Sequence, residues 1–516
     1  MRPLPIGAQF GGSAGGVINI VTKSGSNELH GSLFYFHRND NLDARNTFDL
    51  DPENPTVRSD PPEFKRNQFG FSLGGPIIPN KTFFFAAYEG LREGKGETKF
   101  AVVPVRDPSD PFTVIFTEDG TTQTAVPEVA PYLALWPFPT PGGIDFGDGT
   151  AERIVQATRT VDEDFFQARV DHNFSDRDSA FVRYTISDSE TFRPDDLPEY
   201  SPFELGRNQF ATVEWKRILT NNLFNTSRFG FNRTFTDARM QLAVDIPEAL
   251  DVVAGQPYLT GGNLQPRSGI TSLSASSRGF PVIIALNHED FSNDSNYIRG
   301  SHNFKFGVNI RWIQVNAHEG RRNSGEIRFD DIEDFLDNLG DRFRVLVPGG
   351  DRFRSWRHEY YGFYLQDDIK LTPRLTLNAC LRYEYMTMPD EKYGRCMNLD
   401  DLLVFPPTRE GCPLITDNPT TKNFAPRLGL AWDLSGDGKT ALRAGFGIFH
   451  GNLFPKEYQT PGQSQPPLAT VVSIRPGRGG FPDDLQLLLP GQPLLDRPGI
   501  SVPDVPGDFR PINITQ

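Results

Sequence analysis

Hydrophobic and polar side chains alternate between Ser355 and Met386, a stretch that divides into two extended segments around Thr372-Pro373. In the second segment apolar residues occupy every other position, and polar residues occupy the positions between them. Successive side chains of a strand point to opposite sides, so this period of two gives one apolar and one polar face. A helix over the same residues would place Arg382 and Glu384 in its apolar stripe. The stretch therefore predicts a β-hairpin.

The same design recurs along the chain and predicts thirteen strands, as one leading strand and six hairpins. The leading strand is expected over 29–36, and a short buried strand at 17–21 precedes it. The hairpins are expected at 67–75 with 82–91, 164–174 with 179–187, 208–216 with 222–233, 284–298 with 303–313, within 355–386, and at 424–433 with 440–450.

Short turns and long connections alternate strictly between these strands. The long connections are 38–66, 92–163, 188–207, 234–283, 314–354 and 387–423. Loops of this length are uncommon in compact soluble domains, whereas outer-membrane barrels combine short periplasmic turns with long outer loops. A soluble antiparallel sheet with one wet face explains the alternation but not this sidedness. The pattern therefore predicts an all-β fold, an antiparallel transmembrane β-barrel.

The two faces of the strands fit such a barrel. The apolar face would contact outer-membrane lipid, and the polar face, with an arginine on many strands, would line the lumen. Tyrosine and tryptophan near strand ends suit an aromatic girdle at the membrane surface. The girdle candidates are Trp356, Tyr360, Tyr361, Tyr385 and Trp432.

Composition excludes some classes of function. The 516 residues include 52 basic and 66 acidic side chains, a net charge of −14, and this acidic balance argues against nucleic acid as a partner. No apolar run approaches the roughly 18 residues of a membrane helix. The opening residues contain no signal-peptide pattern, which leaves either a cytoplasmic protein or a missing N-terminus.

The segment GGVINIVTKSGSNELHGSLFYF, residues 15–36, resembles the junction between plug and barrel in TonB-dependent outer-membrane receptors. The segments NQFGFSLGGPIIPNKTFFFAAYEGLRE, YYGFYLQDDIKLTPRLTLNACLRYEY and NFAPRLGLAWDLSGDGKTALRAGFGIFH resemble the Oar-like branch of that family. The resemblance implies a barrel of about 22 strands filled by an N-terminal plug, in the outer membrane of a Gram-negative bacterium. It implies energised uptake of a nutrient solute through the inner-membrane TonB complex. The solute itself stays open.

The chain is expected to be a fragment, because the TonB box, most of the plug and about nine strands of such a barrel are missing. Contact with TonB would use the missing N-terminal region. On this resemblance, 1–24 is the C-terminal remnant of the plug domain, 25–450 is a partial barrel with strands one to thirteen, and 451–516 is a truncated Pro- and Gly-rich outer loop. The alternative is a surface-exposed β-rich binding protein or adhesin without transport.

The resemblance assigns the plug–barrel junction to Gly15, Gly16, Asn19 and Thr22. Lumen-facing side chains are expected to contact the plug, which is favoured, or the solute. They are Arg183, Arg228, Asn309, Arg311, Arg382, Glu384 and Arg443. No catalytic residue, metal or cofactor is expected.

Three local patterns complete the sequence interpretation. The G-x-S-x-G match around Ser13 lacks the strand before it and the helix after it that a nucleophile elbow needs, so a flexible plug loop is the better interpretation and a hydrolase the weaker one. Cys396 and Cys412 lie in one predicted outer loop; two free thiols are the alternative to a disulfide between them, and the disulfide is favoured for an exported protein. Residues 330–340 place Ile332, Phe335, Leu336 and Leu339 at helical spacing and predict a short helix capped by Gly340.

Overall fold

The computed structural model describes residues 7–13, 18, 20–44, 57, 63–253, 255, 263–267, 269–273, 280–398, 409–410, 418, 420–464, 468–477, 485–497 and 500. Within these residues thirteen long strands pair in chain order into one antiparallel sheet, as the sequence predicted. A two-residue strand, β18 (Asp390–Glu391), adds to it beside β16. The thirteen are β1 (His30–Asn39), β2 (Phe64–Ile78), β3 (Thr82–Pro104), β7 (Thr150–Asn173), β8 (Asp178–Phe192), β9 (Tyr200–Thr220), β10 (Leu223–Leu242), β12 (Val282–Arg299), β13 (His302–Glu319), β16 (Arg354–Thr372), β17 (Leu375–Met386), β21 (Asn423–Asp433) and β22 (Ala441–Gly447).

Most strands are longer than the sequence predicted. β3 has 23 residues and β7 has 24, and the two stay paired as far as Pro104 and Thr150. Much of the connection predicted over 92–163 is therefore sheet. The extra residues include many polar ones on both faces, so no alternation marks them, but backbone pairing does not depend on an apolar face.

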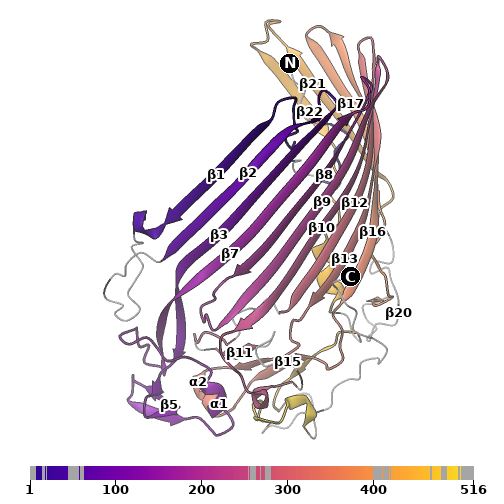
Figure 1. Cartoon of the computed structure of the whole chain (residues 1–516). Coiled ribbons are helices and arrows are strands. Elements are labelled where there is room, and N and C mark those ends of the chain that lie inside the picture. Colours follow the sequence, from indigo (N-terminus) through magenta and orange to yellow (C-terminus); the bar gives the residue numbers. More distant parts are fainter. Residues whose placement is uncertain are drawn as a thin grey trace.

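Burial on the sheet is inverted relative to a soluble protein. In β17 the polar residues Asn378, Arg382 and Glu384 are buried, whereas Leu381 is 48% exposed. Figure 1 shows the long strands side by side in one curved sheet. We call the face that carries Arg382 and Glu384 the lumenal face and the opposite one the outer face. Polar residues inside and apolar residues outside are the arrangement of a membrane β-barrel.

The prediction of a buried strand over 17–21 is wrong for the three described residues of that range. Ile18, Ile20 and Val21 lie in no strand, and they are 90%, 77% and 84% exposed. The sheet begins only at His30, where β1 pairs with β2. An apolar run of this length forms a buried strand only where a partner strand lies beside it.

Parts of the long connections 92–163, 188–207, 234–283 and 314–354 fold together with residues from 468–497 at one end of the sheet (Figure 1). Their elements make a three-stranded sheet of β4 (Arg106–Asp107), β5 (Asp110–Phe116) and β6 (Thr121–Thr124), and a four-stranded sheet of β11 (Asn263–Pro266), β14 (Glu326–Phe329), β15 (Arg342–Leu346) and β23 (Val471–Ile474). The helices α1 (Ala130–Leu133) and α2 (Ile332–Leu336) contribute buried residues to the same hydrophobic core as these sheets. Also present are α3 (Pro455–Gly462), β19 (Met397–Asn398), β20 (Arg409–Glu410), and the 3-10 helices η1 (Asp40–Leu42), η2 (Glu248–Leu250) and η3 (Leu494–Asp496).

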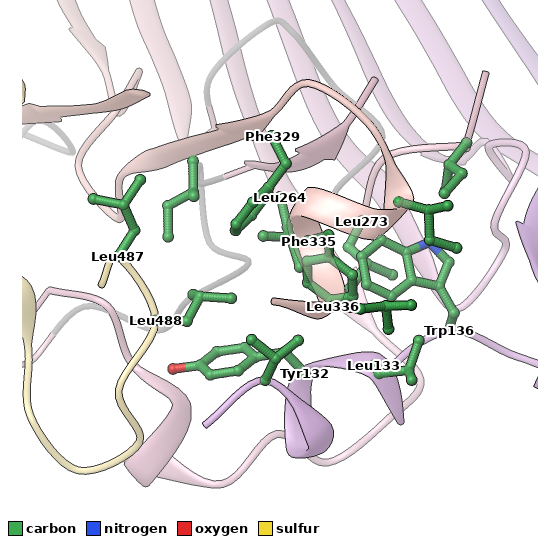
Figure 2. Packing of buried hydrophobic residues seen from close by; sticks show 14 of the residues in the cluster. Tyr132, Leu133, Trp136, Leu264, Leu273, Phe329, Phe335, Leu336, Leu487 and Leu488 are labelled. Atoms are coloured by element: carbon green, nitrogen blue, oxygen red, sulfur yellow. The ribbon is translucent and has the colours of Figure 1, made fainter. Parts of the chain in front are cut away.

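A hydrophobic core holds these connections together, and we call the resulting unit the loop cap, residues 97–152, 195–200, 244–273, 320–350 and 468–497 in their described parts. Figure 2 shows Trp136, Phe335 and Leu488, from three separate connections, pointing toward one another. The ring centroids of Trp136 and Phe335 lie 5.4 Å apart at an interplanar angle of 73°. Both side chains are buried almost completely. The long loops therefore form a folded unit rather than separate connections.

The predicted short helix is present as α2, with Asp331 as its N-cap. Ile332, Phe335 and Leu336 are buried as expected, but Leu339 lies beyond the helix and is 60% exposed. Gly340 does not cap the helix, which ends at Leu336. A side chain at Gly340 would place Cβ 2.3 Å from Leu487, so close packing explains this glycine. No helix among the described residues is long and apolar enough to cross a membrane.

Candidate functional site

Polar side chains from β16, β17 and β21 hold the N-terminal residues 7–13 against the lumenal face. We call this group the lumenal clamp: Tyr360, Gln366, Arg382, Glu384 and Arg427. The Ala8 backbone N–H donates to Gln366 Oε1 at 2.8 Å, and Arg382 Nη1 donates to the Ala8 carbonyl at 3.0 Å. Ala8 is fully buried.

Further contacts fix the segment on both sides of Ala8. The Gly12 backbone N–H donates to Glu384 Oε1 at 2.8 Å. Arg427 Nη1 donates to the carbonyls of Gly7 and Phe10 at 3.0 and 3.2 Å. All of these bonds join clamp side chains to backbone groups of the segment. The clamp therefore binds backbone groups of residues 7–13 rather than their side chains.

The clamp is also bonded internally. Arg382 donates through Nε to Glu384 Oε1 at 2.6 Å and through Nη2 to Tyr360 Oη at 2.8 Å. The Tyr360 hydroxyl donates to the same Glu384 oxygen at 2.6 Å. These three side chains are between 1% and 4% exposed. A buried ion pair is tolerated when its remaining donors and acceptors are bonded, and removal of one partner leaves the other charge uncompensated.

Two glycines allow the segment to approach the clamp this closely. A Cβ atom on Gly11 would lie 1.9 Å from Glu384 Oε1 and 2.0 Å from Arg382 Nε. Gly12 has a φ of 69°, in the left-handed region that favours glycine. The G-x-S-x-G pattern is thus explained here by close packing at its first residue, and residues 7–13 contain none of the strand that a nucleophile elbow requires.

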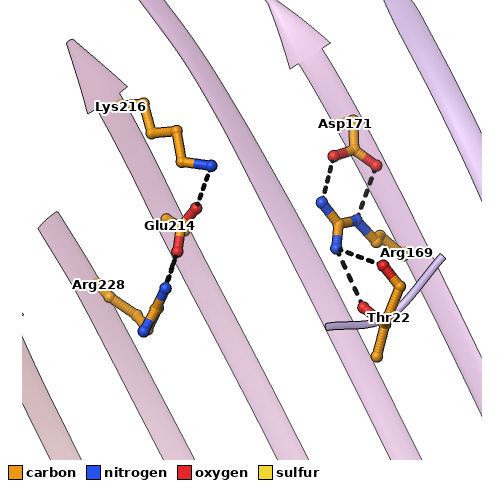
Figure 3. A network of polar contacts seen from close by, with 6 residues as sticks. All are labelled: Thr22, Arg169, Asp171, Glu214, Lys216 and Arg228. Atoms are coloured by element: carbon orange, nitrogen blue, oxygen red, sulfur yellow. Dashed lines mark hydrogen bonds and ion pairs between the residues drawn. The ribbon is translucent and has the colours of Figure 1, made fainter. Parts of the chain in front are cut away.

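The chain makes a second lumenal contact further along. Arg169 of β7 donates through Nη1 to the hydroxyl of Thr22 at 3.0 Å, and Asp171 accepts from the same guanidinium at 2.7 and 2.9 Å (Figure 3). At Gly25 a Cβ atom would lie 2.3 Å from the carbonyl oxygen of Phe84. Gly12, Thr22 and Gly25 therefore lie against β17, β7 and β3, respectively.

A separate ionic group lies on β9 and β10 (Figure 3). The carboxylate of Glu214 accepts from Arg228 Nε at 2.8 Å and from Lys216 Nζ at 3.1 Å. Glu214 is 2% exposed, whereas both cations remain about half exposed or more. One buried carboxylate thus holds two basic side chains on the lumenal face.

The structure distributes the predicted lumenal residues over several sites. Arg382 and Glu384 meet in the clamp, and Arg228 pairs with Glu214. The other four do not join them: Arg311 donates through Nε to Asp290 at 2.5 Å, Arg183 bonds Thr212 at 3.0 Å, Asn309 is half-buried opposite Gly362, and Arg443 is exposed.

Of the predicted junction residues, Thr22 contacts Arg169, while Gly15, Gly16 and Asn19 lie outside the described residues. Cys396 is buried and in a disulfide. Cys412 lies outside the described residues, so its pairing with Cys396 stays a prediction. Within the described part of the chain, no group of three or more histidine, cysteine, aspartate or glutamate residues could hold a metal ion.

Two of the five girdle predictions are wrong. Trp356 and Tyr360 are 0% and 2% exposed, because even-numbered positions of β16 face the lumen. Tyr360 belongs to the clamp. Trp356 packs against Tyr458 of α3, with their ring centroids 5.7 Å apart. Gln366, Arg427 and Arg169 were not predicted as site residues. Their polar positions within alternating strands were the available signal, but no pattern links them to a segment hundreds of residues away.

An antiparallel sheet with a polar lumenal face, an exposed apolar outer face and an N-terminal segment clamped inside defines an outer-membrane β-barrel domain. The chain belongs to the outer membrane beta barrel domain family, whose model matches residues 21–513. It is therefore a protein of the Gram-negative outer membrane.

A stretch of 80 residues is 40% identical to the TonB-dependent transporter Oar of Myxococcus xanthus, which is 16% of this chain and 7% of Oar. With the family match, this confirms the resemblance to TonB-dependent receptors.

The outer membrane transporter YddB of Escherichia coli is 12% identical, with a TM-score of 0.46, over 83% of this chain and 44% of YddB. The siderophore receptor PirA of Acinetobacter baumannii is 12% identical, with a TM-score of 0.46, over 88% of this chain and 47% of PirA. This chain thus spans less than half of the length of YddB and of PirA. The named relatives are transporters and a receptor, not enzymes.

Proposed function

We propose that this chain is part of a TonB-dependent receptor that binds a solute at the loop cap and takes it up across the outer membrane. The observation that carries the proposal is the lumenal clamp. It holds an N-terminal segment inside the barrel through buried charged side chains, and this segment must move before any solute can pass at that position.

In this proposal, residues 1–24 form the end of a plug, 25–450 the first barrel strands, and 451–516 an outer connection. The clamp residues Arg382 and Glu384 act on the plug rather than on the solute, because their bonds go to Ala8 and Gly12. The inner-membrane TonB complex would supply the force through residues that precede the plug end. The loop cap supplies a folded outer surface on which a solute can bind.

The test uses the source bacterium grown in a defined mixture of nutrients. Three strains are compared: the parent, a strain lacking this gene, and a strain with an inactive TonB complex. We expect at least one solute to remain in the medium of both altered strains while the parent removes it, as measured by mass spectrometry of the medium. If every solute disappears equally from all three cultures, transport is rejected and a surface-binding protein without transport is the better interpretation.

A further inference from the structure

Basic side chains gather on the lumenal face of four neighbouring strands, β7 to β10. Arg169 and Arg183 stand directly opposite each other in the β7–β8 register. Arg183 in turn stands opposite Thr212, two residues from Glu214, which is opposite Arg228. Like charges placed directly opposite each other in a sheet are unfavourable unless another group compensates them.

The carboxylates nearby are already engaged. Asp171 holds Arg169, and Glu214 holds both Lys216 and Arg228 (Figure 3). Four cations therefore face two carboxylates, which leaves an excess of two positive charges on this part of the wall.

Arg183 is the cation without an acidic partner. Among the described residues, no carboxylate lies within ion-pair distance of it, and its side chain donates to the Thr212 hydroxyl at 3.0 Å. Its Nε atom is buried and has no hydrogen-bond partner there. A guanidinium presents several donors in a planar fork that matches a carboxylate or phosphate. An anionic group bound here would accept a hydrogen bond from Arg183 Nε and would compensate the positive charge of its guanidinium.

A cavity of about 550 Å³ adjoins this wall at the short-turn end of the sheet. Its lining shares Lys216 with the basic group and has three further cations, Lys81, Arg177 and Arg217, against two carboxylates, Asp176 and Asp178. The excess of positive charge therefore continues from the wall toward the short-turn rim, where an anion leaving the lumen would pass.

We propose that Arg183, flanked by Arg169 and Arg228, is a lumenal binding site for a carboxylate or phosphate group. The inference rests on the proposed function as a receptor, and it narrows the solute to an anionic one if the group belongs to the solute. The same chemistry is supplied if a carboxylate of the receptor's own plug occupies the site. The two sources are separated by experiment.

The test uses the full-length receptor purified in detergent at low ionic strength, with sodium sulfate as the probe in calorimetric titrations. We expect saturable binding that weakens by about tenfold in Arg183→Gln, as for loss of a strong charge-assisted bond. Arg183→Lys, which keeps the charge, should bind with intermediate affinity. The matched control is Arg207→Gln, because Arg207 is paired with Asp188 on the outer face of β9. It should bind sulfate like the wild type.

If a plug carboxylate already occupies the site, the wild type will not bind sulfate. In that case Arg183→Gln should lower the urea concentration that unfolds the plug, while Arg207→Gln should not. The proposal is overturned if Arg183→Gln matches Arg207→Gln in both measurements. Neither measurement involves TonB or uptake, so this result is independent of whether the receptor transports.

Discussion

The Nε atom of Arg382 lies 2.6 Å from Oε1 of Glu384, and both side chains are buried beneath a segment that starts more than 370 residues earlier in the chain. The two residues stand two positions apart on β17, so both point to the lumenal face. The same Glu384 oxygen also accepts from Tyr360 on β16 and from the Gly12 backbone. One carboxylate oxygen therefore connects two strands of the wall to the N-terminal segment.

Replacing Glu384 by glutamine should release the N-terminal segment. The change preserves the shape of the side chain but leaves the buried guanidinium of Arg382 uncompensated, which costs about 3–5 kcal/mol. Hydrogen exchange at residues 7–13 should become faster by at least a hundredfold, the equivalent of about 2.7 kcal/mol. The matched control is Glu359→Gln, since Glu359 also accepts from a neighbouring tyrosine, Tyr361, but on the outer face. Equal exchange in the two variants would contradict a role of the clamp in holding the segment.

A methyl group at Gly11 should have a similar effect without any change of charge. The added Cβ would overlap the side chains of Arg382 and Glu384, so the segment would have to move away from them. Gly7→Ala is the matched control, because its Cβ would meet only Gln9 at 3.9 Å. We expect protease cleavage within residues 7–13 to accelerate in Gly11→Ala and to stay at the wild-type rate in Gly7→Ala. A protected segment in Gly11→Ala would show that the close packing is not required.

The strand count and the two faces of β17 could be predicted from sequence because a period of two is a local signal. A helix would have placed some of the alternating polar residues, including Arg382 and Glu384, in its apolar stripe. The direction in which Trp356 and Tyr360 point was predicted wrongly, because an aromatic residue near a strand end suits either a girdle or a packed lumen. Register decides between these, and one residue of shift moves a side chain to the opposite face.

Contacts between distant segments could not be predicted in the same way. Arg427 bonds the carbonyl of Gly7, and Leu488 exchanges two hydrogen bonds with Asn338. Both contacts form only in the complete fold, and neither segment carries a periodic pattern of polar and apolar residues that predicts them. The loop cap is the clearest case, since its core combines residues from several connections whose sequences show only short apolar runs. For this reason long loops were predicted where the structure has a packed unit.

Truncation of Phe335 should unfold the loop cap while leaving the barrel intact. The ring is fully buried and meets Trp136 and Phe329 at centroid distances of 5.4 and 5.2 Å. Phe335→Ala should cost about 3–5 kcal/mol, the range for large buried aromatic side chains. Leu339→Ala, four residues away but 60% exposed, is the control and should cost little. Limited proteolysis should cut the cap in the first variant only, and fragments from the barrel strands in that sample would argue against an independent cap.

Acid should weaken the cap through Asp341, the residue before β15, which forms an ion pair with Arg328 of β14. Burial alone would raise the pKa of Asp341, but the hydrogen bond and charge of Arg328 outweigh it and hold that pKa below its ordinary value. A carboxyl group whose pKa is lower in the folded state contributes stability above its unfolded-state pKa of about 3.9, and this contribution is lost as the pH falls through the folded-state pKa. Protection of β14 and β15 amides, corrected for the intrinsic pH dependence of exchange, should therefore decrease below about pH 4.

The variant Asp341→Asn removes the titrating group and tests this assignment. It should lose about 1–3 kcal/mol of cap stability at pH 6, because the charged Arg328 loses its partner, and it should show less further loss below pH 4 than the wild type. Asp330→Asn is the control, since Asp330 and its partner Arg267 are both more than half exposed and such pairs contribute little. An acid response of the same size in the Asp341→Asn variant and the wild type would assign the loss to other carboxyl groups of the cap.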